Sequence, residues 1–222
     1  MRHEYKHRIN YEDYLAIRSR LRALASRDAH VGADGTYLVH SLYFDNLYDK
    51  ALREKIDGVE NREKFRIRYY NGDADYIRLE KKSKQHGLCE KQAAPLTKEE
   101  VCAICNGEID FLRLKNNRLL QELYAKMRYQ LLKPIVLVDY RREPYVYAPG
   151  NVRITFDSEI RTGLYHRRLF TETYATAPTE CGAIIMEVKY DAFLPEIMEK
   201  AVRVPGRSSM AYSKYAACRM YG

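Results

Sequence analysis

The chain has 222 residues, of which 46% are hydrophobic and 31% charged, and its formal net charge is +8. This composition is typical of a globular protein rather than a disordered one, and the excess of cations favours an anionic partner such as nucleic acid, a membrane surface or a small polyanion. No run of 18 apolar residues occurs and the first residues are polar, so we expect no transmembrane segment, no signal peptide and a cytoplasmic location. We expect residues 1–222 to form a single domain.

The first part of the chain shows a strand pattern followed by a helical one. Charged residues at positions 2, 4, 6 and 8 would share one face of a strand that ends at Ile9. A helical pattern follows from Tyr11 to Ala25, with Asn10 as the expected N-cap. Its expected apolar stripe comprises Tyr14, Leu15, Ile17, Leu21 and Leu24. The next expected elements are a turn at 32–35, a strand at 36–44 and a short helix or loop at 45–55.

Residues 62–91 carry half of the net charge, because they hold nine Lys and Arg against five Asp and Glu. The pattern from Glu63 to Tyr70 alternates, so that Arg66 and Arg68 lie on one face of the expected strand and Ile67 on the other. The elements expected after it are, in order, a turn at 71–73, a strand at 76–84, a turn at Gly87 and a short strand at 89–93.

The second half is expected to contain helices on either side of three further strands. Thr97 would cap a helix, with Glu100 as its capping-box partner. Helical periodicity also covers 110–128, where the candidate buried residues are Leu112, Leu119, Leu120, Leu123 and Tyr124. The three expected strands are 134–147, 152–156 and 183–190. The last segment, 195–220, is expected to be helical in two pieces around Pro205-Gly206.

Charged side chains recur on one face of several expected strands, whereas the opposite faces are apolar. These positions are Lys6, Arg66 with Arg68, Glu80 with Lys82, Arg153 with Thr155, and Glu187 with Lys189. For any one strand such a face ordinarily meets solvent. Its recurrence suits a barrel in which helices cover the apolar outside and charged side chains line the interior. We therefore expect an α+β fold, with a closed antiparallel β-barrel of about eight strands and surrounding helices.

A barrel interior rich in Lys and Arg requires a counter-charge, because unpaired cations are costly to bury. Phosphate oxygens supply that charge and match the geometry of the Arg side chain. A few carboxylates among so many cations favour a metal ion that bridges phosphate oxygens.

A series of motifs in chain order resembles one known family. The motifs are Arg2-x-Glu4-x-Lys6, Ser41-Leu42-Tyr43-Phe44-Asp45-Asn46, Lys64-Phe65-Arg66-Ile67-Arg68-Tyr69-Tyr70, Leu79-Glu80-Lys81-Lys82, Tyr140-Arg141-Arg142, Arg153-Ile154-Thr155-Phe156-Asp157, Met186-Glu187-Val188-Lys189 and Tyr212-Ser213-Lys214-Tyr215. Together they resemble the polyphosphate polymerase domain of the vacuolar transporter chaperone (VTC) complex, a branch of the triphosphate tunnel metalloenzymes, or CYTH-like superfamily. Each motif alone is weak, but their shared order over nearly the whole chain is specific.

The resemblance implies a tunnel enzyme that transfers the γ-phosphoryl group of ATP to a growing inorganic polyphosphate chain with the help of Mn²⁺ or Mg²⁺. Carried over by position, the phosphate-binding residues would be Lys6, Arg66, Arg68, Lys82, Lys91, Arg142, Arg153 and Lys214. Glu187 would hold the metal, while Lys6 and Lys214 would stabilise charge on the transferring group. The implied partners are ATP and inorganic polyphosphate or triphosphate, with a membrane protein as a further candidate and no nucleic acid.

One position departs from the family pattern. Eukaryotic members carry a second lysine two positions before the final Ser-Lys, where this chain has Ala211, and Arg207 is a candidate to replace that charge. The sequence also shows neither the SPX inositol-phosphate sensor nor the membrane helices of the eukaryotic complex. We therefore expect it to resemble the bacterial stand-alone members.

Three other functions stay open. Triphosphate hydrolysis in the same fold is one, although related hydrolases carry a glutamate where this chain has Arg2. A non-catalytic module that binds polyphosphate or nucleotide is the second. Nucleic-acid binding is the third, but no RRM, KH or helix-turn-helix signature supports it. Cys102-x-x-Cys105 is a single pair, best explained by packing, and some of the 20 tyrosines could stack on adenine.

Overall fold

The computed structural model describes residues 3–86, 88–163, 169–170 and 176–220. The turn expected at Gly87 and the expected strand position of Arg2 lie outside these residues. The chain packs as two compact units. Unit 1 comprises Met1–Leu38, Tyr140–Ile160 and Glu180–Ser213, and unit 2 comprises Val39–Asp139, Arg161–Thr179 and Lys214–Gly222. The expectation of a single domain stays a prediction.

The strands form an antiparallel sheet, which confirms the expected α+β class. Their bounds are β1 (His3–Ile9), β2 (Ser26–Arg27), β3 (Tyr37–Asp45), β4 (Arg62–Tyr70), β5 (Asp73–Gln85), β6 (Leu88–Leu96), β7 (Lys133–Tyr147), β8 (Val152–Gly163), β9 (Ala177–Pro178) and β10 (Ile184–Tyr190). The hydrogen-bonded order is β1-β10-β8-β7-β3-β4-β5-β6, with β2 beside β7 and β9 beside β8.

The sheet is open, so the expected closed barrel of about eight strands is wrong. The sheet has ten strands, and eight of them form a path whose end strands, β1 and β6, do not pair with each other among the described residues. Alternation within a strand fixes which side chains share a face. The alternating pattern does not tell whether the first and last strands of a sheet pair with each other, because that pairing depends on contacts between residues distant in the sequence.

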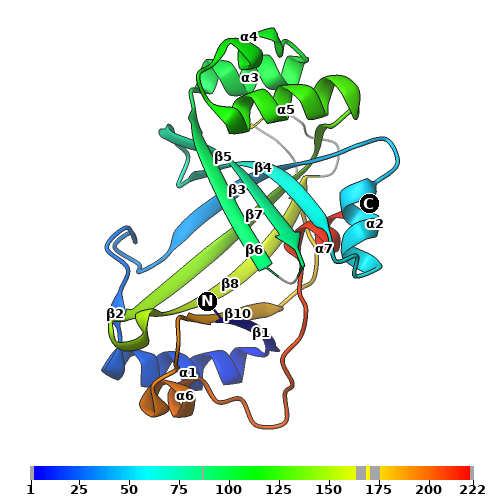
Figure 1. Cartoon of the computed structure of the whole chain (residues 1–222). Coiled ribbons are helices and arrows are strands. Elements are labelled where there is room, and N and C mark those ends of the chain that lie inside the picture. The colour runs from blue at the N-terminus through cyan, green and yellow to red at the C-terminus, as the bar shows by residue number, and fades with distance from the viewer. Residues whose placement is uncertain (1–2, 87, 164–168, 171–175, 221–222) are drawn as a thin grey trace. The chain divides into compact units, whose positions relative to one another are not determined.

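Unit 1 buries the apolar face of β1, β10 and β8 against two helices, α1 (Tyr11–Leu24) and α6 (Glu196–Val202) (Figure 1). The expected N-cap is confirmed, because the Asn10 side chain accepts a hydrogen bond from the backbone of Asp13, whose own carboxylate accepts from the backbone of Asn10. Ile17 and Leu21 are buried as expected. The expectation for Leu15 is wrong, since this side chain is 44% exposed on the outer side of α1.

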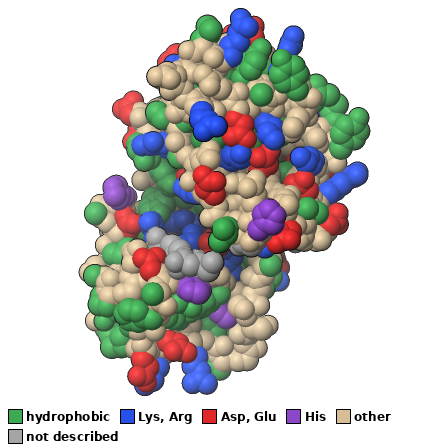
Figure 2. Space-filling view, viewed as in Figure 1, with side chains coloured by type: hydrophobic (Ala, Val, Ile, Leu, Met, Phe, Trp, Pro, Cys, Tyr) green, Lys and Arg blue, Asp and Glu red, His purple; other side chains and the backbone are tan. Residues whose placement is uncertain are grey.

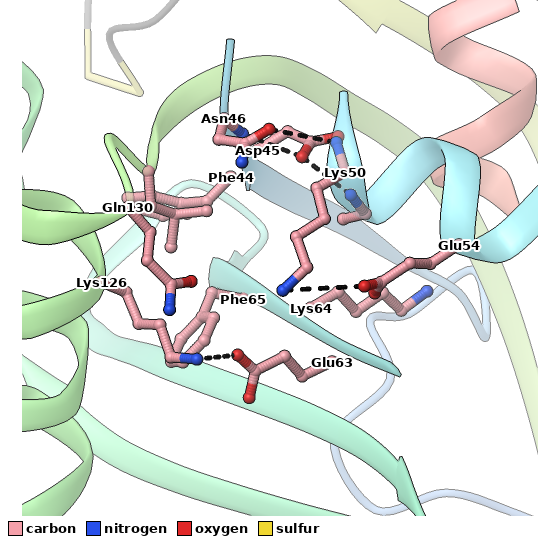
Figure 3. A pocket seen from close by; sticks show the side chains of 12 residues that line it. Phe44, Asp45, Asn46, Lys50, Glu54, Glu63, Lys64, Phe65, Lys126 and Gln130 are labelled. Atoms are coloured by element: carbon pink, nitrogen blue, oxygen red, sulfur yellow. Dashed lines mark hydrogen bonds and ion pairs between the residues drawn. The ribbon is translucent and has the colours of Figure 1, made fainter. Parts of the chain in front are cut away.

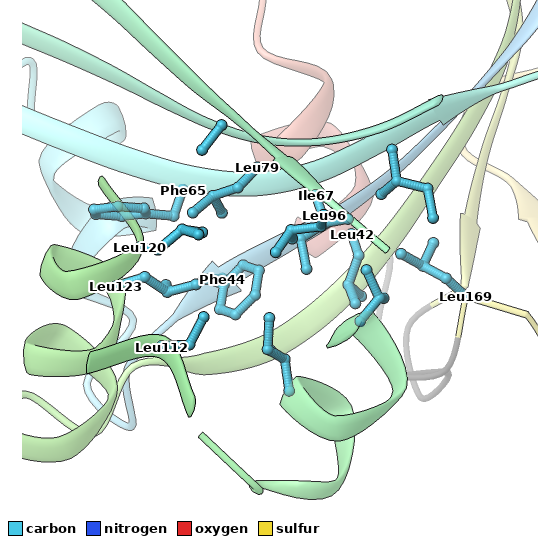
Figure 4. Packing of buried hydrophobic residues seen from close by; sticks show 14 of the residues in the cluster. Leu42, Phe44, Phe65, Ile67, Leu79, Leu96, Leu112, Leu120, Leu123 and Leu169 are labelled. Atoms are coloured by element: carbon cyan, nitrogen blue, oxygen red, sulfur yellow. The ribbon is translucent and has the colours of Figure 1, made fainter. Parts of the chain in front are cut away.

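Unit 2 packs three helices on the apolar face of β3, β4, β5 and β6. They are α3 (Lys98–Asn106), α4 (Asp110–Leu114) and α5 (Arg118–Tyr129). Figure 4 shows Phe65 and Leu79 of the strands near Leu120 and Leu123 of α5, in a cluster that also includes Ile67. The apolar halves of these alternating strands are thereby removed from water, and their basic halves point to the other side of the sheet.

Local signals set the helix boundaries in unit 2. The capping box of Thr97 and Glu100 at the start of α3 is confirmed. The single helical region expected at 110–128 is two helices, since Asn117 caps α5 by accepting hydrogen bonds from the backbone of Leu119 and Leu120. An asparagine side chain competes well with helical hydrogen bonds, which explains the break.

The remaining elements differ from expectation mainly at their ends. The helix α2 (Lys50–Ile56) occupies the end of the region expected as a helix or loop. The last segment is less helical than expected, because α6 ends at Val202 and eleven residues separate it from α7 (Lys214–Met220). A 3-10 turn, η1 (Pro149–Asn151), joins β7 to β8. Gly150 has a φ of 73° there, and a Cβ atom on it would lie 2.6 Å from the carbonyl oxygen of Phe193.

Charges of both signs are interspersed on the face of the molecule that Figure 2 shows. Over the part of the chain that the structure describes, no helix combines the length and apolar character needed to cross a membrane.

Candidate functional site

The polar face of the unit 2 sheet is strongly basic. The register pairs Lys64 with Lys82, Arg66 with Glu80 and Arg68 with Arg78, and it continues from Lys82 to Lys91 on β6. Directly opposed residues point to the same side of an antiparallel sheet. This basic face therefore carries the side chains of Arg62, Lys64, Arg66, Arg68, Arg78, Lys82, Lys84 and Lys91, with Glu80 as the carboxylate among them.

Glu80 is the hub of the basic face. Its carboxylate, 6% exposed, lies 2.6 Å from Arg66, 2.5 Å from Lys91 and 3.8 Å from Arg68. Burial acts to raise the pKa of Glu80, but the charges of Arg66, Arg68 and Lys91 outweigh it and lower this pKa to about 2. Glu80 thus stays ionised at neutral pH and holds these cations in place.

Tyr43 of β3 is a buried phenol among the same cations. Its hydroxyl oxygen accepts a hydrogen bond from Arg66 at 2.9 Å, and the Lys64 ammonium lies 5.6 Å from the ring centroid. Burial acts to raise the pKa of Tyr43, but the charges of Arg66, Lys64 and Arg68 outweigh it and lower this pKa to about 7. Sequence reasoning assigned Tyr43 no role, because its partners lie on another strand.

Lys214, one of the two lysines expected to be catalytic, is the first residue of α7. The next residue, Tyr215, donates a hydrogen bond to Asp45, which also accepts from the backbone of Ala51 and Leu52 at the start of α2. Within unit 2, Asp45 therefore joins the start of α7 to the start of α2. This explains the aspartate of the Ser41–Asn46 motif.

Unit 1 contains the second group of expected site residues. Glu187 of β10 is 5% exposed, and its carboxylate lies 3.1 Å from Lys189, 3.6 Å from Lys6 and 3.7 Å from Arg142. Burial acts to raise the pKa of Glu187, but the three cations and a hydrogen bond with Glu4 hold it well below its usual range. The pKa of Lys6 is raised, because its attraction to Glu187 and Glu4 exceeds the effect of burial.

The two arginines expected in unit 1 engage different carboxylates. Arg142 forms a bidentate salt bridge with Asp157, in which it donates two hydrogen bonds of 2.6 and 2.7 Å. This pairing fixes the orientation of its guanidinium beside Glu187. Arg153 instead binds Asp28 at 2.9 Å and the hydroxyl of Tyr37 at 3.2 Å. Register still places it beside Lys189 on the same face.

Thr155 lies directly opposite Glu187 in the register of β8 and β10. Its hydroxyl is buried and has no hydrogen-bond partner, an arrangement that is costly unless a ligand or water completes it. Thr155, Glu187 and Glu4 thus offer oxygen atoms of the kind that Mg²⁺ and Mn²⁺ bind. The described residues contain no group of three or more His, Cys, Asp or Glu that could hold a metal. This oxygen set suits a metal that arrives with phosphate, because such ions commonly use one or two carboxylates and phosphate oxygens.

A small cavity in unit 2 is lined in part by Lys64 of the basic face but not by Glu80 or the cations that contact it (Figure 3). It encloses about 20 Å³, room for about one water molecule, between β4, α2 and α5. Two of its lysines are paired, Lys126 with Glu63 and Lys50 with Glu54. It is therefore a packing feature rather than a substrate site.

The structure brings most of the expected site residues together within their units. Lys6, Arg142 and Glu187 meet in unit 1, and Arg66, Arg68 and Lys91 meet around Glu80 in unit 2. Lys82 shares the basic face, Arg153 binds Asp28 and Tyr37, and Lys214 begins α7. Sequence reasoning missed the hub role of Glu80 and assigned no site role to Tyr43, Arg78 and Thr155. Cross-strand pairing, which one strand alone does not specify, is what identifies them.

Two further expectations concern residues outside the two groups. Arg207 binds Asp13 at 2.5 Å within unit 1, and its replacement of a lysine at Ala211 stays a prediction. On α3, Cys105 packs against the hydrophobic core, as expected for a structural residue, whereas Cys102 is exposed and the packing expected for it is wrong.

Comparison with known proteins gives one family. The family described as the VTC domain matches residues 1–221. HpAC1 of Hippeastrum, which was proposed to be an adenylyl cyclase and has a dominant triphosphatase activity, is similar in structure with a TM-score of 0.60 and 16% identity, over 100% of this chain and 96% of that chain. A candidate adenylate cyclase from Bacillus halodurans has a TM-score of 0.51 and 14% identity, over 89% of this chain and 83% of that one. At these identities the likeness concerns the fold alone. No curated protein matches the chain.

Proposed function

The chain belongs to the VTC domain family, and on that premise we propose that it transfers the γ-phosphoryl group of ATP to a growing inorganic polyphosphate chain. The observation that carries the proposal is the basic face of unit 2. From the opposed pair Arg62–Lys84 to the pair Arg68–Arg78, and across to Lys91, eight cations share this face with one carboxylate, Glu80, which leaves a net charge of +7. A polyanion supplies the missing negative charge, and Arg side chains suit phosphate oxygens because they present two parallel donors.

The charged face of unit 1 has a different balance. It carries five cations, Lys6, Arg8, Arg142, Arg153 and Lys189, and three carboxylates, Glu4, Asp157 and Glu187, so its net charge is +2. A more balanced face of this kind suits a cation that accompanies phosphate. Glu187, with Glu4 and the hydroxyl of Thr155, would hold Mn²⁺ or Mg²⁺, which would neutralise phosphate charge when bound.

The chain's own residues then have distinct roles in the proposed reaction. Lys6 and Lys214 stabilise the charge that develops on the transferring group, because phosphoryl transfer depends chiefly on positioning and electrostatics. The terminal phosphate of the growing chain is the nucleophile, so no Ser or Cys nucleophile is needed. The remaining cations bind non-bridging oxygens and guide the rest of the anion; they are Arg66, Arg68, Lys82, Lys91, Arg142 and Arg153.

Two neighbouring lysines test whether the basic face binds phosphate. Lys82 lies on this face, whereas Lys81 points to the other side of β5 and pairs with Glu63 at 3.1 Å. We expect Lys82→Met to weaken the binding of inorganic triphosphate by about 1 kcal/mol, roughly fivefold in Kd, because an exposed lysine contributes a modest ionic contact. Titration calorimetry on each folded variant measures this.

The matched variant Lys81→Met removes the same charge from the same strand. We expect it to lower stability, since Glu63 and Glu122 lose a partner, and to leave the Kd for triphosphate unchanged. Equal losses of affinity in the two variants would reject a face-specific phosphate site.

Other expectations from the sequence stay predictions. They are the cytoplasmic location, the membrane-protein partner and the absence of a nucleic-acid partner. Triphosphate hydrolysis and binding without turnover are the two outcomes that product analysis separates from polymerisation.

A further inference from the structure

A cavity of about 320 Å³ opens on the basic face of unit 2, near the turn between β4 and β5. Its volume is within the range of small-molecule sites. The lining side chains are Arg68, Tyr70, Tyr76, Arg78, Glu80 and Lys91, with Ala93 at the β6 side. All of them belong to unit 2.

The two ends of this cavity differ in chemistry. One end is the network of Arg68 and Lys91 around Glu80, which already belongs to the proposed phosphate site. The other end is aromatic, since the Tyr70 and Tyr76 rings lie with centroids 6.4 Å apart and planes inclined by 34°. The cavity thus joins a cationic end to an end with ring surfaces.

Arg78 lies where the two ends meet. Its guanidinium carbon is 4.9 Å from the centroid of the Tyr76 ring, and it has no acidic partner among the described residues. A planar guanidinium beside an aromatic ring can stack on a second flat group and donate hydrogen bonds to its edge. Tyr76 is 50% exposed, so part of its ring remains open to contact.

We propose that Tyr70, Tyr76 and Arg78 form a subsite for the base of a nucleoside triphosphate, with its phosphates extending toward Arg68 and Lys91. This inference rests on the proposed function, because it names where the nucleotide donor is held. A purely inorganic polyanion has no flat group and would not use the ring surfaces. A nucleoside triphosphate uses both ends, since every base has a face that stacks on aromatic side chains.

Binding of two ligands to the same variants tests the subsite. The ligands are the β,γ-imido analogue of ATP, which is not turned over, and inorganic triphosphate, which lacks a base. We expect Tyr76→Ala to weaken binding of the analogue about tenfold, in the range found for one stacking contact. We expect its Kd for inorganic triphosphate to change by less than about twofold, because the phosphate contacts remain.

Conservative variants separate stacking from charge and folding. Tyr76→Phe keeps the ring and should retain the affinity for the ATP analogue. Arg78→Lys keeps the charge but loses the planar group, so it should weaken binding of the analogue and spare triphosphate. Tyr129→Ala removes a tyrosine that is 79% exposed at the end of α5 and should change neither affinity.

Each contrary result has one meaning. Equal losses for both ligands in Tyr76→Ala, or no loss for either, would reject the base subsite. Equal Kd values of the wild-type protein for the ATP analogue and for inorganic triphosphate would also reject the base subsite. Wild-type protein that prefers the ATP analogue but makes no polyphosphate would keep the subsite and reject the polymerase. A protein that binds neither ligand would reject both.

Discussion

At the scale of single residues, two buried glutamates of unit 1 differ in what surrounds them. Glu187 contacts Lys6, Lys189 and Arg142 on the charged face. Glu143, 4% exposed, lies on the helix-covered side. It accepts hydrogen bonds from the hydroxyl of Tyr14 at 2.6 Å and from Arg18 at 2.8 Å. The first carboxylate belongs to the proposed reaction, and the second joins the strand β7 to α1.

Replacing each glutamate with glutamine tests whether Glu187 serves the reaction and Glu143 serves stability. We expect Glu187→Gln to lower turnover of ATP by at least about 10- to 100-fold, the range for lost support of a metal or phosphate site. Glu143→Gln should lower the melting temperature and leave turnover per folded protein within about twofold, because Arg18 loses a charged partner distant from the reaction. Steady-state kinetics with thermal unfolding of both variants provides the comparison. Full activity in Glu187→Gln would remove this residue from the mechanism.

Tyr43 makes a prediction about pH. The groups that face it are Lys64, Arg66 and Arg68 from β4, Glu80 of β5 through its pair with Arg66, and the Tyr215 ring of α7 at 5.2 Å. The folded pKa of about 7 is below the ordinary tyrosine value of about 10. The phenol therefore contributes no ionisation-linked stability below pH 7, a growing one as pH rises from 7 to 10, and the full amount above 10.

Near-ultraviolet absorbance of tyrosinate measures this titration. One tyrosine of the wild-type protein should ionise near neutral pH, and Tyr43→Phe should lose that step. Bound triphosphate should raise this pKa, because its negative charge offsets the cations that lower it. A near-neutral titration that persists in Tyr43→Phe would assign it to another tyrosine.

At the scale of elements, Asp45 holds two helices of unit 2. It is fully buried and accepts from the start of α2 and from Tyr215 of α7. We expect Tyr215→Phe to destabilise unit 2 by about 1.5–3 kcal/mol, the typical contribution of a hydrogen bond to a charged group. Chemical denaturation measures the loss. A change below about 0.5 kcal/mol would show that Asp45 finds water instead.

Alternation and capping signals predicted much of the element structure. The order Phe65, Arg66, Ile67, Arg68 correctly separated a core face from a basic face, because side chains alternate along a strand whatever lies nearby. Asn10 and Thr97 correctly marked helix starts, since capping uses atoms within three residues.

Long-range contacts were not predictable in the same way. The pairing of Arg153 with Asp28 and the cations around Tyr43 join residues far apart in sequence, so no local pattern reports them. Leu15 fits the helical period but lies at the margin of the apolar stripe, where a small error in rotation decides exposure. The open sheet was also not predictable from local patterns, because closure depends on pairing between the strands at opposite ends of the strand order.

At the scale of the whole molecule, the net charge of +8 is unevenly distributed. The basic face of unit 2 carries +7, while the charged face of unit 1 carries +2. Binding of polyanions should therefore weaken as ionic strength rises. Salt screens the interaction between exposed charges, and the Debye length is about 10 Å at 0.1 M. Triphosphate Kd values that stay constant across a salt series would contradict a binding site dominated by this face.

Product analysis tests the central claim most directly. Purified protein is incubated with ATP and Mn²⁺ or Mg²⁺, and ADP, free phosphate and polyphosphate are each quantified, the last by gel separation and digestion with an exopolyphosphatase. The account predicts that ADP equals the phosphate found in long chains, with little free phosphate. Stoichiometric release of free phosphate or triphosphate cleavage without chains would contradict it and assign hydrolysis. Binding of ATP without any turnover would contradict it equally and leave a binding module.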